Sequence, residues 1–321
     1  MKRFFRILPV LLAALSAACS PHEFPFSGPG DLGKDFALRI VLEDDLEDLP
    51  QITPTKSGQI ASPRYTMLFW RYRDGNAFGG EPDYSVTFTR SSLADLDTTI
   101  YLPVLAAKYR MAGWVDWAGG DAGPGYDLSD PGRIMLPAEY AAGERARDAF
   151  AVVADYDVDA YHRAGEGYQQ TASLQRPVAQ LRIVAPEALT FLALTGLEPS
   201  SMRATLRYTA PVPDGYDLLQ GTTAASRPDV TLTATPRYDT SGELVFVSDF
   251  LFSTDAGTTI PVAFTLTDQS GNQVIVYSGD IPLRRGHATT VSFDMPYGGD
   301  VKPGGIGIDP GFDDEIEINL D

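Results

Sequence analysis

Three carboxylates at alternate positions come closest to a catalytic or metal-binding pattern in this sequence. They are Asp155, Asp157 and Asp159, with His162 three residues further along. Because alternate side chains of a strand share one face, a hard cation such as calcium could take oxygen ligands there. Side chains two positions apart on a straight strand are about 7 Å from each other, too far for three to hold one ion. We therefore favour a solvent-facing strand and predict no metal site.

The motifs that enzymes need are absent from the sequence. It contains no G-x-S-x-G turn, no H-E-x-x-H helix, no glycine loop for phosphate and no cysteine–histidine pair. Its three histidines are His22, His162 and His287. We predict that the protein is not an enzyme and carries no cofactor. A hydrolase would instead need two carboxylates that converge in a cleft.

Aromatic residues are the other candidates, because an exposed aromatic face can stack on a sugar ring. The candidates are Trp70, Trp114, Trp117, Tyr65, Tyr72 and Tyr109. Phe69 and Trp70 are neighbours, so their side chains point to opposite faces of a strand, and the same parity separates Trp114 from Trp117. At most one member of each pair can lie in a given core. Packing is the favoured role for these residues, and a glycan platform is the alternative.

Cys19 is the only cysteine, and its position predicts a lipid anchor. Basic residues precede an apolar run at residues 7–18, which is typical of a secretory signal and too short to span a bilayer. Ser16-Ala17-Ala18-Cys19 resembles the bacterial lipobox, with Ser16 where a leucine is usual. We expect residues 1–18 to be removed as a signal peptide and Cys19 to be acylated. An ordinary cleaved signal with an incidental cysteine is the alternative.

The composition also limits the partners. The formal net charge is −18, so neither nucleic acid nor anionic lipid would be attracted by a positive field. Residues 19–35 are rich in proline, glycine and serine, which predicts a flexible tether. We therefore expect a body that stands off the outer membrane, surface-exposed, and meets the membrane only through lipid on Cys19.

Short runs of β-type residues separated by turn clusters fill the rest of the chain. Strands are expected at residues 36–42, 65–72, 84–90, 99–102, 108–117, 148–158, 174–184, 202–208, 230–234, 243–253, 259–267, 273–281 and 288–295. A short helix is expected at residues 186–197, between Pro186 and Gly196, and a hairpin turn at residues 268–272.

This order of elements predicts an all-β protein with two tandem antiparallel β-sandwich domains. We place the domains at residues 36–190 and 191–298, with the boundary at the short helix. Residues 299–321 then form a glycine-rich linker and a C-terminal strand, in which Ile316, Ile318 and Leu320 alternate with polar residues. Such a strand folds back on its own domain or adds to the edge of another chain.

Several segments resemble, in order, those of the fimbrillin-like surface lipoproteins of the Bacteroidales. The matching segments are Lys108 to Trp117, Asp148-Ala149-Phe150, Leu174 to Leu181, Ile281 to Val291 and Ile308 to Phe312. The chain departs from the family pattern at Gln180, where lysine is usual, and at Gly286, where asparagine is frequent. The matches run from about residue 36 to the end.

The resemblance implies two transthyretin-like sandwiches, export as a lipoprotein and, in pilus-forming members, assembly outside the outer membrane. In those members an arginine-specific protease removes the first strand, and a C-terminal strand of another subunit fills the groove. Carried to this chain, Arg64 and Arg39 are the candidate cleavage sites, and Ile316, Ile318 and Leu320 are the candidate donor residues.

We therefore predict a non-enzymatic, surface-exposed lipoprotein of fimbrillin type, a structural or adhesive component of fimbria-like assemblies. Its partners are the membrane, through Cys19, and like or related subunits. A monomeric surface lipoprotein that binds a glycan or another ligand is the alternative. Deleting the C-terminal strand separates the two, because only the first would lose self-association.

Overall fold

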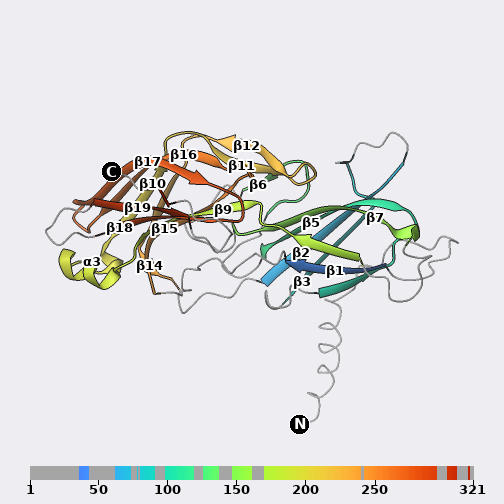
Figure 1. The fold of residues 1–321 in the computed structure, drawn as a ribbon, viewed down its shortest axis with the longest axis horizontal. Helices are drawn as coiled ribbons and strands as arrows, with labels where there is room; N and C mark the ends of the chain where they lie inside the picture. The colour runs from blue at the N-terminus through green and yellow to red at the C-terminus, as the bar shows by residue number, and fades with distance from the viewer. Residues whose placement is uncertain are drawn as a thin grey trace, which may run out of the picture.

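The computed structural model describes residues 36–42, 62–73, 78, 80–90, 98–118, 126–136, 147–160, 170–239, 242–294, 302–308 and 317–318. Cys19, the predicted signal peptide and the predicted tether lie outside these residues. Within them the chain forms five β-sheets, distributed over two bodies that follow one another along the long axis (Figure 1). The expected all-β fold is confirmed. None of the described helices is long and apolar enough to cross a membrane.

The N-terminal domain packs a four-stranded sheet, in the order β3-β2-β5-β7, against a three-stranded sheet, β4-β1-β8. The bounds are β1 Phe36–Leu42, β2 Ser62–Arg71, β3 Tyr84–Thr89, β4 Thr98–Leu102, β5 Lys108–Ala118, β7 Phe150–Asp157 and β8 Gln170–Leu174. Side chains from both sheets share one buried core. The first strand, β1, is central in its sheet because it pairs antiparallel with β4 and parallel with β8.

The C-terminal domain contains a six-stranded sheet, β14-β15-β9-β18-β19-β20, a four-stranded sheet, β13-β10-β16-β17, and a small sheet, β12-β11-β6. The bounds are β6 Ile134–Met135, β9 Val178–Ala185, β10 Arg203–Tyr208, β11 Val212–Asp217, β12 Thr222–Arg227, β13 Thr231–Ala234, β14 Arg237–Tyr238, β15 Leu244–Phe252, β16 Thr258–Thr267, β17 Gln273–Leu283, β18 Ala288–Asp294, β19 Lys302–Ile308 and β20 Glu317–Ile318. Two short helices, α3 at Ala188–Thr195 and η4 at Pro199–Ser201, follow β9.

Strand pairing places the division between the two domains before β9, earlier than the predicted boundary at residue 190. β9 pairs with β15 and β18 of the C-terminal domain. The run expected as one strand at residues 174–184 is two strands, because β8 ends at Leu174 and β9 begins at Val178. Pro177 lies in the gap, and a proline has no backbone N–H for a sheet.

The end of the chain also differs from the prediction. The residues expected to form a glycine-rich linker include β19, which pairs antiparallel with β18. The pairing skips Gly304, which is the extra residue of a bulge next to Pro303. Proline and glycine are tolerated in strands at such bulges, so their presence does not prevent pairing. The helix and the hairpin turn were predicted correctly, and Gly196 ends α3 in the left-handed conformation.

The parity prediction for neighbouring aromatics is confirmed. Phe69 belongs to the core between the two N-terminal sheets, whereas Trp70 belongs to a second core that is continuous with the C-terminal domain. Trp114 belongs to this second core as well, and Trp117 to neither. The sheet β3-β2-β5-β7 is therefore buried on both faces over part of its length, and its outer face joins the two domains.

Gly113 on β5 is required by this close packing. A Cβ atom there would lie 2.7 Å from Met67 Sδ and 2.8 Å from Val152 Cγ1. We expect Gly113→Val to lower the free energy of unfolding by about 2 kcal/mol, since overpacking forces neighbours from their preferred positions. Urea denaturation followed by tryptophan fluorescence measures the change. Gly80→Val is the control, because a Cβ atom on Gly80 would meet no other atom within 4 Å; equal effects of the two variants would contradict the packing account.

Candidate functional site

Two of the three alternate carboxylates, Asp155 and Asp157, lie beside basic side chains. Asp155 accepts two hydrogen bonds from Arg110, at 2.9 and 3.0 Å, and this pairing lowers the pKa of the Asp155 carboxyl. Asp157 lies 3.7 Å from Lys108 Nζ and accepts a hydrogen bond from the Ala160 amide. Across the residues that the structure describes, no three metal-ligating side chains gather. His162 lies outside them.

The aromatic residues proposed as a glycan platform are buried, with one exception. Trp70, Trp114, Trp117, Tyr65 and Tyr109 are each at most 4% exposed. Tyr72 is 39% exposed, and its ring packs against Phe78 with 5.0 Å between centroids. A platform built from the tryptophans is therefore excluded, and Tyr72 remains available to a ligand.

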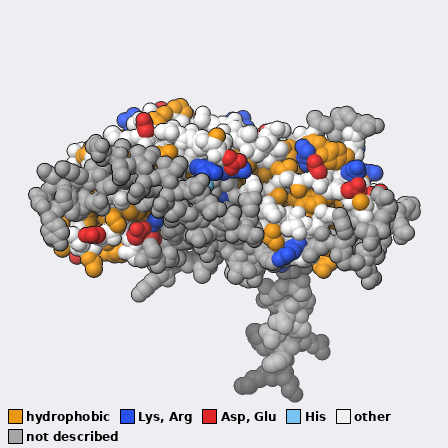
Figure 2. Space-filling model, in the orientation of Figure 1, with side chains coloured by type: hydrophobic (Ala, Val, Ile, Leu, Met, Phe, Trp, Pro, Cys, Tyr) orange, Lys and Arg blue, Asp and Glu red, His pale blue; other side chains and the backbone are white. Residues whose placement is uncertain are grey.

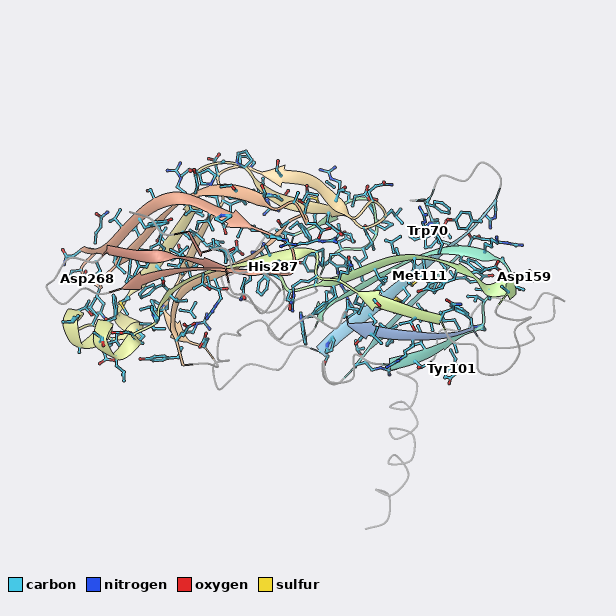
Figure 3. All side chains as sticks on the ribbon, viewed as in Figure 1. Trp70, Tyr101, Met111, Asp159, Asp268 and His287 are labelled. Carbon is cyan, nitrogen blue, oxygen red and sulfur yellow. The ribbon has the colours of Figure 1, made fainter. Side chains whose placement is uncertain are left out.

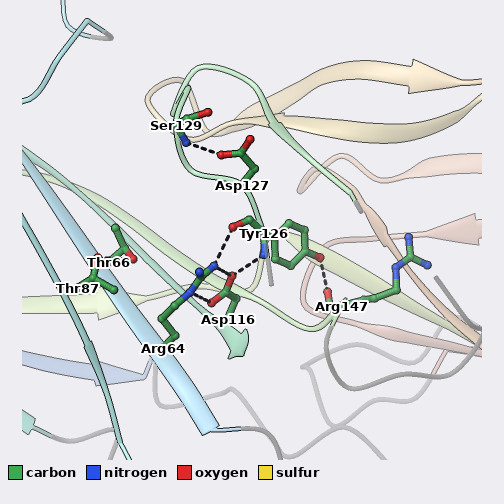
Figure 4. A network of polar contacts seen from close by, with 8 residues as sticks. All are labelled: Arg64, Thr66, Thr87, Asp116, Tyr126, Asp127, Ser129 and Arg147. Atoms are coloured by element: carbon green, nitrogen blue, oxygen red, sulfur yellow. Dashed lines mark hydrogen bonds and ion pairs between the residues drawn. The ribbon is translucent and has the colours of Figure 1, made fainter. Parts of the chain in front are cut away.

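Arg64 is a structural residue of the folded protein. It lies in β2, which is paired with β3 and β5 on both sides at this position. Its guanidinium binds Asp116 with two bonds of 2.8 and 2.5 Å and donates to the Tyr126 carbonyl at 2.8 Å (Figure 4). Asp116 is buried, and also accepts from the Tyr126 amide at 2.9 Å. Cleavage after Arg64 therefore requires the first residues of β2 to detach.

We expect Arg64→Ala to lower the free energy of unfolding by about 3 kcal/mol, because it leaves the buried Asp116 charge without its cation. Arg110→Ala is a matched control, since it removes an equally bidentate pair on the same sheet. The Arg110–Asp155 pair is more exposed, with side chains 30% and 51% accessible, and should contribute less than about 1 kcal/mol. Similar losses in urea denaturation would show that Asp116 does not depend on Arg64.

The network around Arg64 continues into the C-terminal domain. The Tyr126 hydroxyl donates to the Arg147 carbonyl at 2.6 Å, and the Arg147 side chain pairs with Asp249 of β15. Asp249 also accepts from the Tyr208 hydroxyl at 2.7 Å. The Arg147 and Asp249 side chains are 2% and 0% exposed. Burial raises the pKa of Asp249, while Arg147 acts in the opposite direction.

Two of the segments that resemble the fimbrillin-like family, Asp148-Ala149-Phe150 and Leu174 to Leu181, meet where the two domains join. Arg176, from the segment after β8, binds Asp148 through two bonds of 2.8 and 3.1 Å and lies over the Phe150 ring at 4.9 Å. A further segment of this kind, Ile281 to Val291, contacts the second one, because the Gly286 amide donates to the Val178 carbonyl at 2.8 Å. These residues fix the strand entries, so their role is structural.

We expect the Arg147–Asp249 pair to behave as one unit. Arg147→Met or Asp249→Leu alone leaves a buried charge and should lower the free energy of unfolding by about 3 to 5 kcal/mol. The double variant leaves no charge and should be far closer to the wild type than the sum of the single effects. Arg73→Met, whose pair with Asp83 is exposed on the arginine side, is the control. Additive losses in urea denaturation would contradict this coupling.

The groove that β1 fills is the second candidate site. Phe36, Leu38 and Ile40 alternate along β1, and all three are 0% exposed. Leu38 lies opposite Ile100 of β4 and Gln170 of β8. Arg39, the other predicted cleavage site, lies between Leu38 and Ile40 in β1, and its side chain is exposed. Loss of β1 would therefore leave an apolar groove with unpaired backbone on both walls.

The C-terminal strand is described only at Glu317 and Ile318. These two residues form β20, opposite Gly307 and Ile306 of β19 at the edge of the six-stranded sheet. Ile316 and Leu320 lie outside the described residues. The described part of the predicted donor strand thus pairs within its own chain.

A pocket of about 190 Å³ lies where the two domains meet. We call it the junction pocket; its walls include Val153, Gln175, Tyr216, Leu218, Gln220 and Arg285. Sequence patterns did not indicate these residues, because they come from four distant segments. Arg147 and Asp249 were missed as well, although a carboxylate inside the otherwise apolar run of β15 was a usable signal, since such a group needs a buried cation.

Comparison with known proteins gives a family and a fold. Residues 36–321 match the model of a family of unknown function, DUF6562. The chain is similar to the structure of a candidate adhesin from Bacteroides thetaiotaomicron, with a TM-score of 0.50 and 11% identity over 89% of this chain and 98% of that one. No curated protein matches the sequence.

Two further structures show lower similarity. A candidate polysaccharide-binding protein from the same organism gives a TM-score of 0.49 and 13% identity over 89% of this chain and 99% of that one. The fimbrial anchor protein of Porphyromonas gingivalis gives a TM-score of 0.43 and 10% identity over 86% of this chain and 96% of that one. The resemblance predicted from the sequence is confirmed at the level of the fold, through the candidate adhesin.

Proposed function

Since the chain belongs to the DUF6562 family, whose function is unknown, we propose that it is a non-enzymatic cell-surface lipoprotein of fimbrillin type. It is anchored in the outer membrane through lipid on Cys19 and serves as a structural or adhesive component of fimbria-like assemblies. The fold shared with a candidate adhesin supports this role. The burial of the tryptophans argues against the tryptophan-based glycan platform of the alternative function.

The observation that carries the proposal is the position of β1. It is a central strand whose three inward side chains are fully buried, yet it is the first strand that the structure describes. A strand at the start of the fold can be released by a single cut, and its loss would open a continuous groove. We propose that subunits assemble when a strand from a neighbouring chain fills this groove.

The donor is the C-terminal strand. Ile316, Ile318 and Leu320 have the same alternate spacing as Phe36, Leu38 and Ile40, which they would replace. In the described part of the tail, Glu317 and Ile318 pair with Gly307 and Ile306 of β19 at a sheet edge. Assembly then exchanges this edge pairing for a position between two strands in the groove of another subunit, where backbone groups are paired on both sides.

Cleavage after Arg64 would release β1 together with the lipid. The Arg64–Asp116 pair and the pairing of β2 make this site slow to cut, because the start of β2 must open first. A cut at Arg39 would instead divide β1. We therefore propose Arg64 as the processing site and opening of the first residues of β2 as the step that limits it.

Treatment of the full chain with an arginine-specific protease should give a cut at Arg64, followed by oligomers. Arg64→Lys, which keeps the charge, should stay uncut there and monomeric. After treatment, Ile318→Asp should remain monomeric because a carboxylate would enter the apolar groove, whereas Glu317→Gln, on the opposite face of the strand, should assemble like the wild type. Mass spectrometry and light scattering measure both steps. No cut at Arg64, or cut subunits that never assemble, would rule the proposal out.

A further inference from the structure

The junction pocket combines polar groups with an apolar wall. Arg285 donates from Nη2 to Gln175 Oε1 at 3.1 Å, and from Nε to Asp255, whose carboxylate is exposed. Val153, which is 37% exposed, supplies apolar surface, Leu218 lines the pocket from within the core, and Gln220 is exposed at the rim. Figure 3 labels His287, two residues after Arg285, near the point where the domains meet.

Tyr216 forms the floor of the pocket on the side of the C-terminal domain. Its ring stacks on Phe252 with 5.4 Å between centroids, so its position is fixed by the core. Burial raises the pKa of the Tyr216 hydroxyl, while Arg285, which hydrogen-bonds to it, acts in the opposite direction. Because arginine is the donor in that bond, the hydroxyl proton can still be donated to a ligand. A Cβ atom on Gly221 would lie 3.8 Å from this hydroxyl, so the oxygen faces the loop that also carries Gln220.

The pocket continues onto a surface that we call the Tyr72 platform, consisting of Tyr72, Phe78, Arg110 and Asp155. Val153, in the pocket wall, and Asp155 are alternate residues on the same face of β7, and Arg110 lies opposite Asp155. The Arg110 guanidinium lies over the Phe78 ring at 4.7 Å. Figure 2 shows hydrophobic side chains gathered on this part of the N-terminal domain, beside paired basic and acidic groups.

The charges of both surfaces are compensated within the protein. Arg285 pairs with Asp255, and Arg110 pairs with Asp155. An anionic ligand would meet these carboxylates as well as the net charge of −18. A strongly apolar ligand would cover the exposed Gln220 amide without forming hydrogen bonds to it. The remaining chemistry is that of a neutral molecule with many hydroxyl groups and apolar C–H faces.

We propose that the junction pocket and the Tyr72 platform bind a neutral oligosaccharide. One sugar ring occupies the pocket, which is smaller than the roughly 300 Å³ at which sites for drug-sized ligands begin. Its hydroxyls bond to Tyr216, Gln175 and Gln220. The following sugars extend along β7 and stack on Tyr72, whose ring is the exposed aromatic surface there. This inference rests on the proposed adhesive function and names its ligand class.

An array of immobilised neutral oligosaccharides of glucose, galactose, mannose and N-acetylglucosamine tests the proposal, with sialylated and sulfated oligosaccharides on the same array. The full chain should bind neutral members. The variant Tyr216→Phe with Gln220→Ala should bind the best of them about tenfold more weakly by calorimetry, as expected for the loss of two hydrogen bonds. Gln273→Ala, an exposed glutamine on β17, is the matched control and should bind like the wild type.

Tyr72→Ala tests the extension of the site. It should weaken binding of the longer oligosaccharides while leaving the single sugar unchanged, and Tyr101→Ala, an exposed tyrosine on β4, should affect neither. The site is overturned if no neutral oligosaccharide binds, if only sialylated or sulfated ones bind, or if the Tyr216 and Gln220 changes leave affinity intact. Assembly after protease cleavage does not involve Tyr216, Gln220 or Tyr72. Measuring assembly therefore tests the proposed function independently of oligosaccharide binding.

Discussion

The junction between the domains depends on charges that are buried where water cannot reach them. Arg147 and Asp249 pair at the centre of the junction, and a continuous path of hydrogen bonds leads from them through Tyr126 to Arg64 and Asp116 on the outer side. Each buried charge is costly alone and acceptable only with its partner, so removing one member of a pair is unfavourable. Arg147 lies three residues before β7 and Asp249 lies in β15, so the pair connects these two strands across the junction.

The same network ties the start of the fold to its interior. Arg64 begins the part of β2 that faces the core, and the chain before it leads back to β1. The N-terminal domain therefore has a strand that is central in its sheet but peripheral in the sequence. A cut after Arg64 removes Arg64 together with β1, so Asp116 loses its cation. The Arg147–Asp249 pair and the bond from Tyr126 to Arg147, in contrast, are made by later segments and remain. Strand exchange and a rigid junction are compatible for this reason.

Much of the fold follows from alternation in the sequence, and what was missed has identifiable causes. Strands such as β5 and β16 are long and were predicted from their pattern, although each contains one breaker, Gly113 in β5 and Pro261 in β16. β11 begins Val212-Pro213-Asp214-Gly215, which has the composition of a turn, and it forms a strand only because β12 and β6 pair with it. β19 is similar, since its glycines are accommodated by a bulge opposite β18. The junction pocket brings Gln175, Tyr216 and Arg285 together only after β7, β9 and β11 are in place, and local patterns contain no information on such long-range pairing.

The central claim is that the tail of one subunit occupies the groove left by β1 in another. The chain has a single cysteine, so a pair of new cysteines can report this contact without ambiguity once Cys19→Ser is introduced. Ile100, which faces Leu38 across β1 and β4, would then face the centre of the incoming strand, near Ile318. Directly opposed residues of paired strands are close enough for a disulfide. After cleavage by the arginine-specific protease, a chain with Ile100→Cys and Ile318→Cys should form a ladder of disulfide-linked oligomers, and a protein that stays monomeric under oxidising conditions would contradict the account.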